Sequence, residues 1–176
     1  MEFKNYKREK VDLIQHCFEQ KAKHQNLTIF VGTDSISVGG FIHYFAVVAF
    51  RYGMSGAHFI FAKDKVPTYR FGNGKPDIMT KLRREGHMTL DIANLIVDNG
   101  VCDKDQIIVE LDYNDLIQTI STKIIPEMKG WAMASGYQVL TKYGDSVLVD
   151  FGSGLQEINE QVAVKAANHL CQGVSG

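Results

Sequence analysis

The chain has 176 residues, of which 45% are hydrophobic and 22% charged, with a formal net charge of −1. This length suits a single domain over residues 1–176, and no apolar run approaches the roughly 20 residues that a membrane-spanning helix needs. The three cysteines are widely spaced without a Cys-x-x-Cys pair, which excludes a disulfide framework and a zinc knuckle. The first residues lack the apolar segment of a secretory signal, so we expect a cytoplasmic protein with no membrane partner.

The N-terminal segment predicts an amphipathic helix. Apolar residues recur at helical spacing among charged ones from Tyr6 to Lys23. We therefore expect residues 1–26 to form an N-terminal helical extension of a core that covers residues 27–176.

Three β-prone segments follow and predict an antiparallel meander. They run from Leu27 to Ser35, from Phe41 to Phe50 and from His58 to Ala62, and glycine-containing turns separate them. In the first strand, Asp34 shares a face with Phe30 and Gly32. A carboxylate at the end of a central strand is costly to desolvate unless a cation meets it.

A loop and a long helix come next. The loop spans Val66 to Pro76, and Asp77 is an N-cap candidate for a helix that runs to about Asp98. Glu85 lies at the centre of the face of this helix that is predicted to point inward. Apart from Thr89, the other residues of this face are apolar. Glu85 is thus a second acid at a buried position.

The second half predicts helix-connected strands. Gln106 to Asp112 is a nearly continuous apolar strand that ends in a third acid, with Glu110 on the same face. We then expect a helix from about Asn114 to Ser135, a strand from Tyr137 to Lys142, and a strand or helical turn from Ser146 to Phe151. A last helix is expected from Ser153 to about Leu170, because the sequence that begins at Ser153 matches a capping box. The order predicts an α/β fold with a mixed five-stranded sheet, helices on both faces and the N-terminal helix.

The three acids suggest a metal site. If the strands that hold Asp34 and Asp112 are parallel neighbours, their carboxyl ends lie side by side and Glu85 approaches from the helix. Hard divalent cations such as Mg²⁺ take oxygen ligands, so clustered carboxylates suit them. Two such ions can activate a water and stabilise the leaving oxygen of a phosphodiester.

Several short motifs carry a resemblance to a known family. The turn Gly32-Thr33-Asp34-Ser35, the helix segment Leu82-Arg83-Arg84-Glu85 and the strand end Leu111-Asp112 resemble the YkuK-type ribonuclease H-like family. The resemblance implies a ribonuclease H-like fold and a nuclease that uses Mg²⁺ or Mn²⁺. By position, it implies that Asp34 bridges both metals, that Asp112 binds one, and that Glu85 completes the cluster and positions the attacking water.

A fourth acid is expected at the last helix, but the sequence does not single one out. Where the family pattern continues into an Ala-Asp pair, this chain has Val147-Leu148-Val149-Asp150. Asp150, Glu157 and Glu160 all remain candidates, and Asp150 is our first choice as a metal ligand.

A basic segment between Lys63 and Arg84 predicts the substrate surface. It carries a net charge of +5, which leaves −6 for the rest of the chain. Such a segment is either a solvated loop or a contact surface for RNA, an RNA–DNA hybrid or DNA. The expected substrate-binding residues are its basic side chains Lys63, Lys65, Arg70, Lys75, Arg83 and Arg84. The alternative function is a non-catalytic ribonuclease H-like module that binds nucleic acid or a protein partner, and the oligomeric state stays open.

Overall fold

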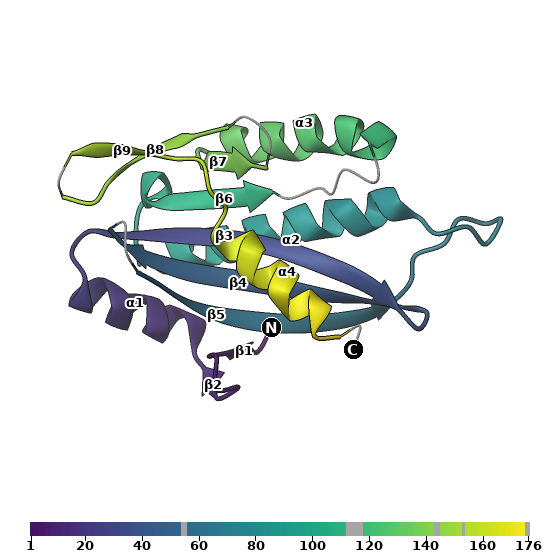
Figure 1. The fold of residues 1–176 in the computed structure, drawn as a ribbon, viewed down its shortest axis with the longest axis horizontal. Helices are drawn as coiled ribbons and strands as arrows, with labels where there is room; N and C mark the ends of the chain where they lie inside the picture. Colours follow the sequence, from purple (N-terminus) through teal and green to yellow (C-terminus); the bar gives the residue numbers. More distant parts are fainter. Residues whose placement is uncertain (54–55, 112–117, 143–144, 153, 175–176) are drawn as a thin grey trace.

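The computed structural model describes residues 1–53, 56–111, 118–142, 145–152 and 154–174, with the side chains of 118–123 left out. A seven-stranded mixed sheet forms its centre, in the order β2-β1-β5-β4-β3-β6-β7 (Figure 1). The strands are β1 Phe3–Lys4, β2 Lys10–Val11, β3 Leu27–Val38, β4 Phe41–Tyr52, β5 Ala57–Pro67, β6 Ile107–Leu111 and β7 Gln138–Thr141. The helices are α1 Leu13–Lys23, α2 Ile78–Asp98, α3 Gln118–Ala134 and α4 Ala163–Gln172. No helix in the described ranges is long and apolar enough to cross a bilayer.

The predicted meander is confirmed. β3 pairs antiparallel with β4 and β4 with β5, whereas β6 lies parallel to both β3 and β7. The β3–β4 hairpin closes through Gly39 and Gly40, whose φ angles of 60° and 80° suit the tight two-residue turn between Val38 and Phe41. The strands of the meander are longer than predicted, and β5 extends to Pro67, so Lys63 and Lys65 lie on a strand.

Two N-terminal strands correct the prediction of five strands and of a purely helical extension. β1 pairs with β5 and with β2, so the first residues belong to the same sheet. The helix α1 begins at Leu13, because the Asp12 side chain accepts a hydrogen bond from the Gln15 amide at 2.8 Å and caps it there. The periodicity from Tyr6 to Val11 therefore belongs to a β-hairpin.

A second correction concerns the residues before the last helix. The capping-box pattern predicts a helix from Ser153, but β8 Val147–Asp150 and β9 Leu155–Ile158 form a separate antiparallel hairpin, and α4 starts only at Ala163. The Asp150 carboxylate accepts hydrogen bonds from the amides of Gly152 and Gly154 at 2.7 and 3.2 Å. Both glycines have φ near 90° or above, which a helix does not allow. The local turn therefore overrides the capping-box pattern.

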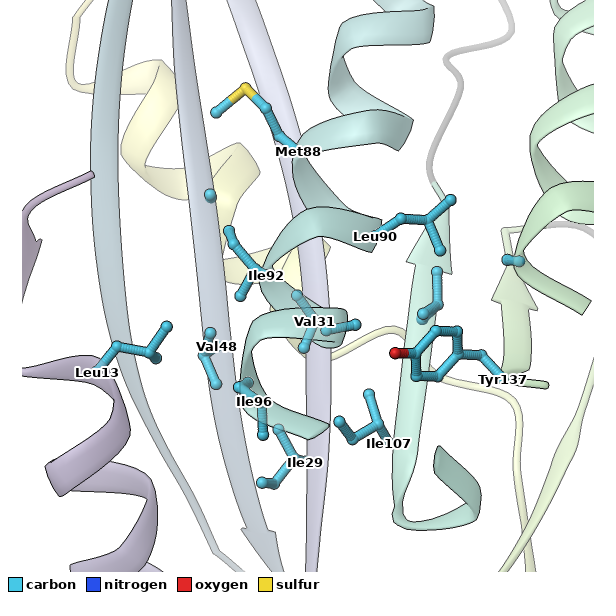
Figure 2. Close-up of a cluster of buried hydrophobic side chains, with 14 of the residues drawn as sticks. Leu13, Ile29, Val31, Val48, Met88, Leu90, Ile92, Ile96, Ile107 and Tyr137 are labelled. Atoms are coloured by element: carbon cyan, nitrogen blue, oxygen red, sulfur yellow. The ribbon is translucent and has the colours of Figure 1, made fainter. Parts of the chain in front are cut away.

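The sheet is covered on both faces, as predicted. On one face, α1, α2 and α3 bury a core with the inward residues of the strands. Figure 2 shows part of it, with Ile92 and Ile96 of α2 beside Ile29 and Val31 of β3. On the other face, α4 and the β8–β9 hairpin cover Phe30, and α4 lies across β3 and β4 in Figure 1.

A histidine pair fixes α1 to the sheet. The Nε2 atoms of His16 on α1 and His58 on β5 lie 2.8 Å apart, and both rings pack against Phe50. Burial lowers the pKa of both imidazoles, and the positive charge of Lys23 lowers the pKa of each further. Both rings are therefore favoured in their neutral form in the folded protein.

This pair predicts a pH-dependent stability. Because each folded-state pKa lies below the unfolded value of about 6.5, the unfolded chain binds more protons and acid favours unfolding. The free energy of unfolding should fall as the pH drops from about 7.5 towards the lowered pKa values, with no further loss from these groups below them. Urea unfolding across this range measures the slope. His16→Asn should flatten it, and an unchanged slope in that variant would contradict the assignment.

Candidate active site

The sheet opens at the carboxyl end of β6. β3 pairs with β6 over four residues, ending with Gly32 opposite Glu110. Among the described strands, β3 continues from Thr33 to Val38 with only β4 beside it. Side chains from both faces of the sheet can approach this open edge, and ligands commonly bind beyond the carboxyl ends of parallel strands.

Asp34 lies two residues into the open part of β3, on the face that α4 covers. It is half-buried and is the cross-strand partner of Phe45. Its carboxylate lies close to the thiol of Cys171, in the last turn of α4. Burial raises the pKa of Cys171, and the negative charge of Asp34 raises it further. The thiol thus stays protonated and can donate to the carboxylate.

Glu85 reaches the same edge from α2, on the opposite face. Its side chain is 3% exposed and accepts a hydrogen bond from the Ser35 hydroxyl. The ammonium of Lys81, one turn earlier on α2, donates to the Ser35 carbonyl at 3.1 Å. Glu85 also raises the pKa of Cys171, so its charge acts across the open edge on the α4 side. The predicted inward position of Glu85 is therefore correct.

A second buried acid, Glu110 on β6, holds α4 in place. Its side chain is fully buried, and its two carboxylate oxygens accept hydrogen bonds from the amides of Val162 and Val164 at 2.6 and 2.8 Å. These amides belong to the first turn of α4, whose own N-cap residue Val162 supplies no side-chain cap. A carboxylate at the positive end of a helix is favourable, so the side chain of Glu110, on β6, acts as the N-terminal cap of α4.

Gly32 allows this close approach. A Cβ at this position would lie 2.7 Å from Cγ2 of Val164 and 3.3 Å from Cβ of Glu110. Since real Cβ atoms do not tolerate the shorter distance, the glycine of the Gly-Thr-Asp-Ser motif lets α4 rest on β3. The same contact seats Cys171, two turns further along α4, on Asp34.

Sequence reasoning missed the polar side chains of α4, because it expected an acid at the last helix, whereas the helix carries Asn168 and Cys171. Asn168 follows Val164 by one turn and precedes Cys171 by one turn, so it lies on the face that covers β3. It lines a cavity of about 310 Å³ together with Lys142, Glu160 and Lys165. Gln161, also in its wall, donates to the carbonyls of Leu111 and Leu140, so this cavity lies at the carboxyl ends of β6 and β7.

The other predicted acids are distributed as follows. Asp112 lies outside the described residues, directly after Leu111, the last residue of β6. Asp150 is the last residue of β8 and lines a cavity with Leu27 and Thr28, at the start of β3. At about 3.3 Å per residue, that end of β3 is about 20 Å from Asp34, so the structure does not bring Asp150 and Asp34 together.

The six predicted basic residues fall into three pairs. Lys63 and Lys65 lie exposed on β5, above the rings of Phe45 and Phe41. Arg70 and Lys75 lie in the loop between β5 and α2, where the Arg70 guanidinium donates to the Gly74 carbonyl at 2.7 Å.

The third pair is engaged in partly exposed ion pairs within the protein. Arg83 forms a two-bond ion pair with Glu127 of α3, and Arg84 donates to Asp64 of β5 at 2.6 Å. These ion pairs raise the pKa of both guanidinium groups. They also join α2 to its neighbours on both sides.

The donor set is suited to a hard cation, but it is incomplete in the described residues. Asp34 and Glu85 offer carboxylate oxygens, the ligand type that Mg²⁺ and Mn²⁺ prefer. In the described ranges, no group of three or more histidine, cysteine, aspartate or glutamate side chains is arranged to hold a metal ion. A third carboxylate ligand would therefore have to come from outside those ranges, as the prediction for Asp112 requires.

Comparison with known families gives one match. A family model described as Ribonuclease H-like matches residues 9–147, well over half of the chain. The chain belongs to the ribonuclease H-like family. The mixed α/β fold, with its meander followed by two parallel strands, is consistent with this family, and the resemblance drawn from the sequence motifs is confirmed. The match ends before β9 and α4. No curated protein and no solved structure matches the chain.

The cap provided by Glu110 predicts a large cost of removing it. Glu110→Ala leaves two buried amides without their acceptor and should lower the free energy of unfolding by roughly 2–4 kcal/mol. Glu110→Gln keeps one acceptor and should cost less. Urea unfolding measures both variants against Glu157→Ala, an exposed change expected to stay within about 0.5 kcal/mol. A loss in Glu110→Ala as small as in this control would contradict the capping role.

Two glycines give a matched pair of predictions. Gly32→Ala should destabilise the protein by about 1–3 kcal/mol, because its Cβ forces α4 away from β3. Gly130→Ala, inside α3 with open space where the new Cβ would lie, should stabilise the protein by roughly 0.5–1 kcal/mol. Thermal unfolding of the two variants measures the contrast. Equal melting temperatures would mean that the contact between Gly32 and Val164 is not tight in solution.

Proposed function

We propose that this ribonuclease H-like protein is a metal-dependent nuclease that hydrolyses phosphodiester bonds in RNA, an RNA–DNA hybrid or DNA. The observation that carries the proposal is the approach of two carboxylates, Asp34 and Glu85, to the open edge of β3 from opposite faces of the sheet. Placing two carboxylates from different layers at the end of one strand costs free energy, because like charges repel in a partly buried site. A purely structural role would not require this cost.

In this proposal, Asp34, Glu85 and Asp112 hold Mg²⁺ or Mn²⁺. The bound metal would supply an activated water and stabilise the leaving oxygen of the phosphodiester. The chain itself fixes its ligands: the Ser35 hydroxyl orients Glu85, and the Cys171 thiol orients Asp34. Lys81, held on the Ser35 carbonyl, brings a positive charge to the same edge and can attract the phosphate oxygens.

Nucleic acid as the substrate is supported by the family and by the cations around the edge. A phosphodiester backbone must approach an anionic site, and flanking lysine and arginine side chains lower the cost of that approach. Lys63 and Lys65 on β5, and Arg70 and Lys75 in the following loop, are the candidates for this contact. Arg83 and Arg84 are engaged in ion pairs and act first as supports of α2.

A second candidate function is a non-catalytic module that binds nucleic acid or a protein. It is favoured by the side chains that α4 directs towards the site, which are Asn168 and Cys171 rather than a carboxylate. A neutral amide coordinates a divalent cation more weakly than a carboxylate does.

The test compares Asp34→Asn with Asp91→Asn, an exposed acid on the outer side of α2. Labelled RNA, hybrid and DNA substrates are incubated with Mg²⁺, Mn²⁺ or EDTA. The parent and Asp91→Asn should cleave only with metal, and Asp34→Asn should not cleave. In samples free of nucleic acid, Mn²⁺ should raise the melting temperature of the parent but not of Asp34→Asn, because a ligand that binds only the folded state stabilises it.

The outcomes separate the two functions. Cleavage that persists in Asp34→Asn would place the activity outside this site. Nucleic-acid binding by the parent without cleavage under any metal condition would favour the non-catalytic module.

A further inference from the structure

A cavity of about 500 Å³ lies on the α4 face of the sheet, between β5 and the end of α4. Its wall includes the basic side chains of Lys4, Arg8 and Lys63, and the aromatic rings of Phe45 and Phe61. Figure 1 shows the N-terminal strands and the end of α4 close together at this place. The volume is in the range of small-ligand sites, and the wall combines positive charge with aromatic surface.

The strand register connects this cavity to the candidate active site. Asp34 on β3 is opposite Phe45 on β4, and Phe45 is opposite Lys63 on β5, so the three side chains form one row on the same face. Neighbouring strands are about 4.8 Å apart, so Lys63 starts about 10 Å from Asp34. Next to this row, Phe61 is opposite Lys4 of β1. The cavity is thus the direct continuation of the site across the sheet.

Arg8 is held at this cavity at a conformational cost. It has a φ of 65°, and it is the one non-glycine residue of the described chain with a positive φ. The turn that imposes it is built by Asn5, whose side-chain oxygen accepts hydrogen bonds from the amides of Lys7 and Glu9. An arginine in the left-handed region is uncommon, and such strain is often kept where a side chain serves a function.

The charge balance of the wall favours an anion. Glu2 is its one acid among the described wall residues, and its carboxylate forms ion pairs with Lys10 at 2.6 Å and with Lys4 at 3.5 Å. Arg8 and Lys63 therefore face the cavity with little compensation from this acid. His169 of α4 adds a hydrogen-bonding ring at the opposite wall.

We propose that this cavity binds one nucleotide of a single-stranded nucleic acid, next to the phosphate that lies at Asp34. Arg8, Lys63 and Lys4 bind the phosphate, and the base lies against the half-exposed ring of Phe61. A base can reach this ring only when it is unstacked, which a single strand allows and a closed duplex does not. This inference rests on the proposed nuclease function and names its substrate class as single-stranded RNA or DNA.

The test measures binding in EDTA, where cleavage cannot occur, with a fluorescently labelled short oligonucleotide. Arg8→Ala plus Lys63→Ala should weaken single-strand binding roughly tenfold and flatten the salt dependence by about 0.7 for each lost phosphate contact. Phe61→Leu keeps apolar volume but removes the stacking surface, and should weaken binding roughly tenfold with an unchanged salt slope.

The matched control is Lys7→Ala plus Lys23→Ala. It also removes two positive charges, one from the same turn as Arg8, but neither side chain lines the cavity. This control should bind like the parent, and melting temperatures should show that all variants are folded. A 4-thiouridine oligonucleotide cross-linked to the parent should attach to peptides that contain Phe61 or Arg8.

Identical affinity and salt slope in the parent and in Arg8→Ala plus Lys63→Ala would overturn the inference, as would an equal loss of duplex binding in that variant. The two proposals fail separately. Binding that depends on the cavity, in a protein that never cleaves, supports this site and overturns the nuclease. Metal-dependent cleavage, together with binding that is unchanged in the cavity variants, supports the nuclease and overturns this site.

Discussion

The arrangement of this protein depends on one buried charge. Glu110 lies on β6, next to the edge strand β7, with no exposed surface, and its carboxylate accepts hydrogen bonds from the first amides of α4. Burying a carboxylate is costly, but two short charge-assisted hydrogen bonds and the positive end of a helix offset that cost. A ten-residue helix without its own cap is thereby fixed in position and direction.

The direction of α4 in turn builds one half of the candidate site. Because its first turn rests on Gly32, its last turn lies over Asp34, and Cys171 meets the carboxylate there. The other half comes from α2, which brings Glu85 and Lys81 to Ser35. Two helices on opposite faces thus act on consecutive residues of one strand. This is possible because, among the described strands, β3 continues past its last pair with β6 with only β4 beside it.

The basic segment shows how tertiary structure divides a charge cluster. In the sequence, Lys63 to Arg84 is one run with a net charge of +5. In the structure, Arg83 and Arg84 neutralise acids of α3 and β5 and hold α2 between them. Lys63, on the opposite face of β5 from Asp64, instead joins Arg8 from the N-terminal hairpin. The basic residues that can contact a polyanion therefore depend on which face of a strand each side chain occupies and on which side chains are ion-paired. The number of basic residues in the segment is not sufficient to identify them.

The sequence by itself determined the meander, the cap of α2 at Asp77 and the buried position of Glu85, because each follows from periodicity or from a hydrogen bond between near neighbours. Only the tertiary structure decided that Glu110 caps a helix and that β1 joins the sheet. Glu110 and its amide partners are 52 and 54 residues apart. The periodicity of the sequence predicts that such an acid is buried. The amides that donate hydrogen bonds to it are determined by the packing of segments that are distant in the sequence.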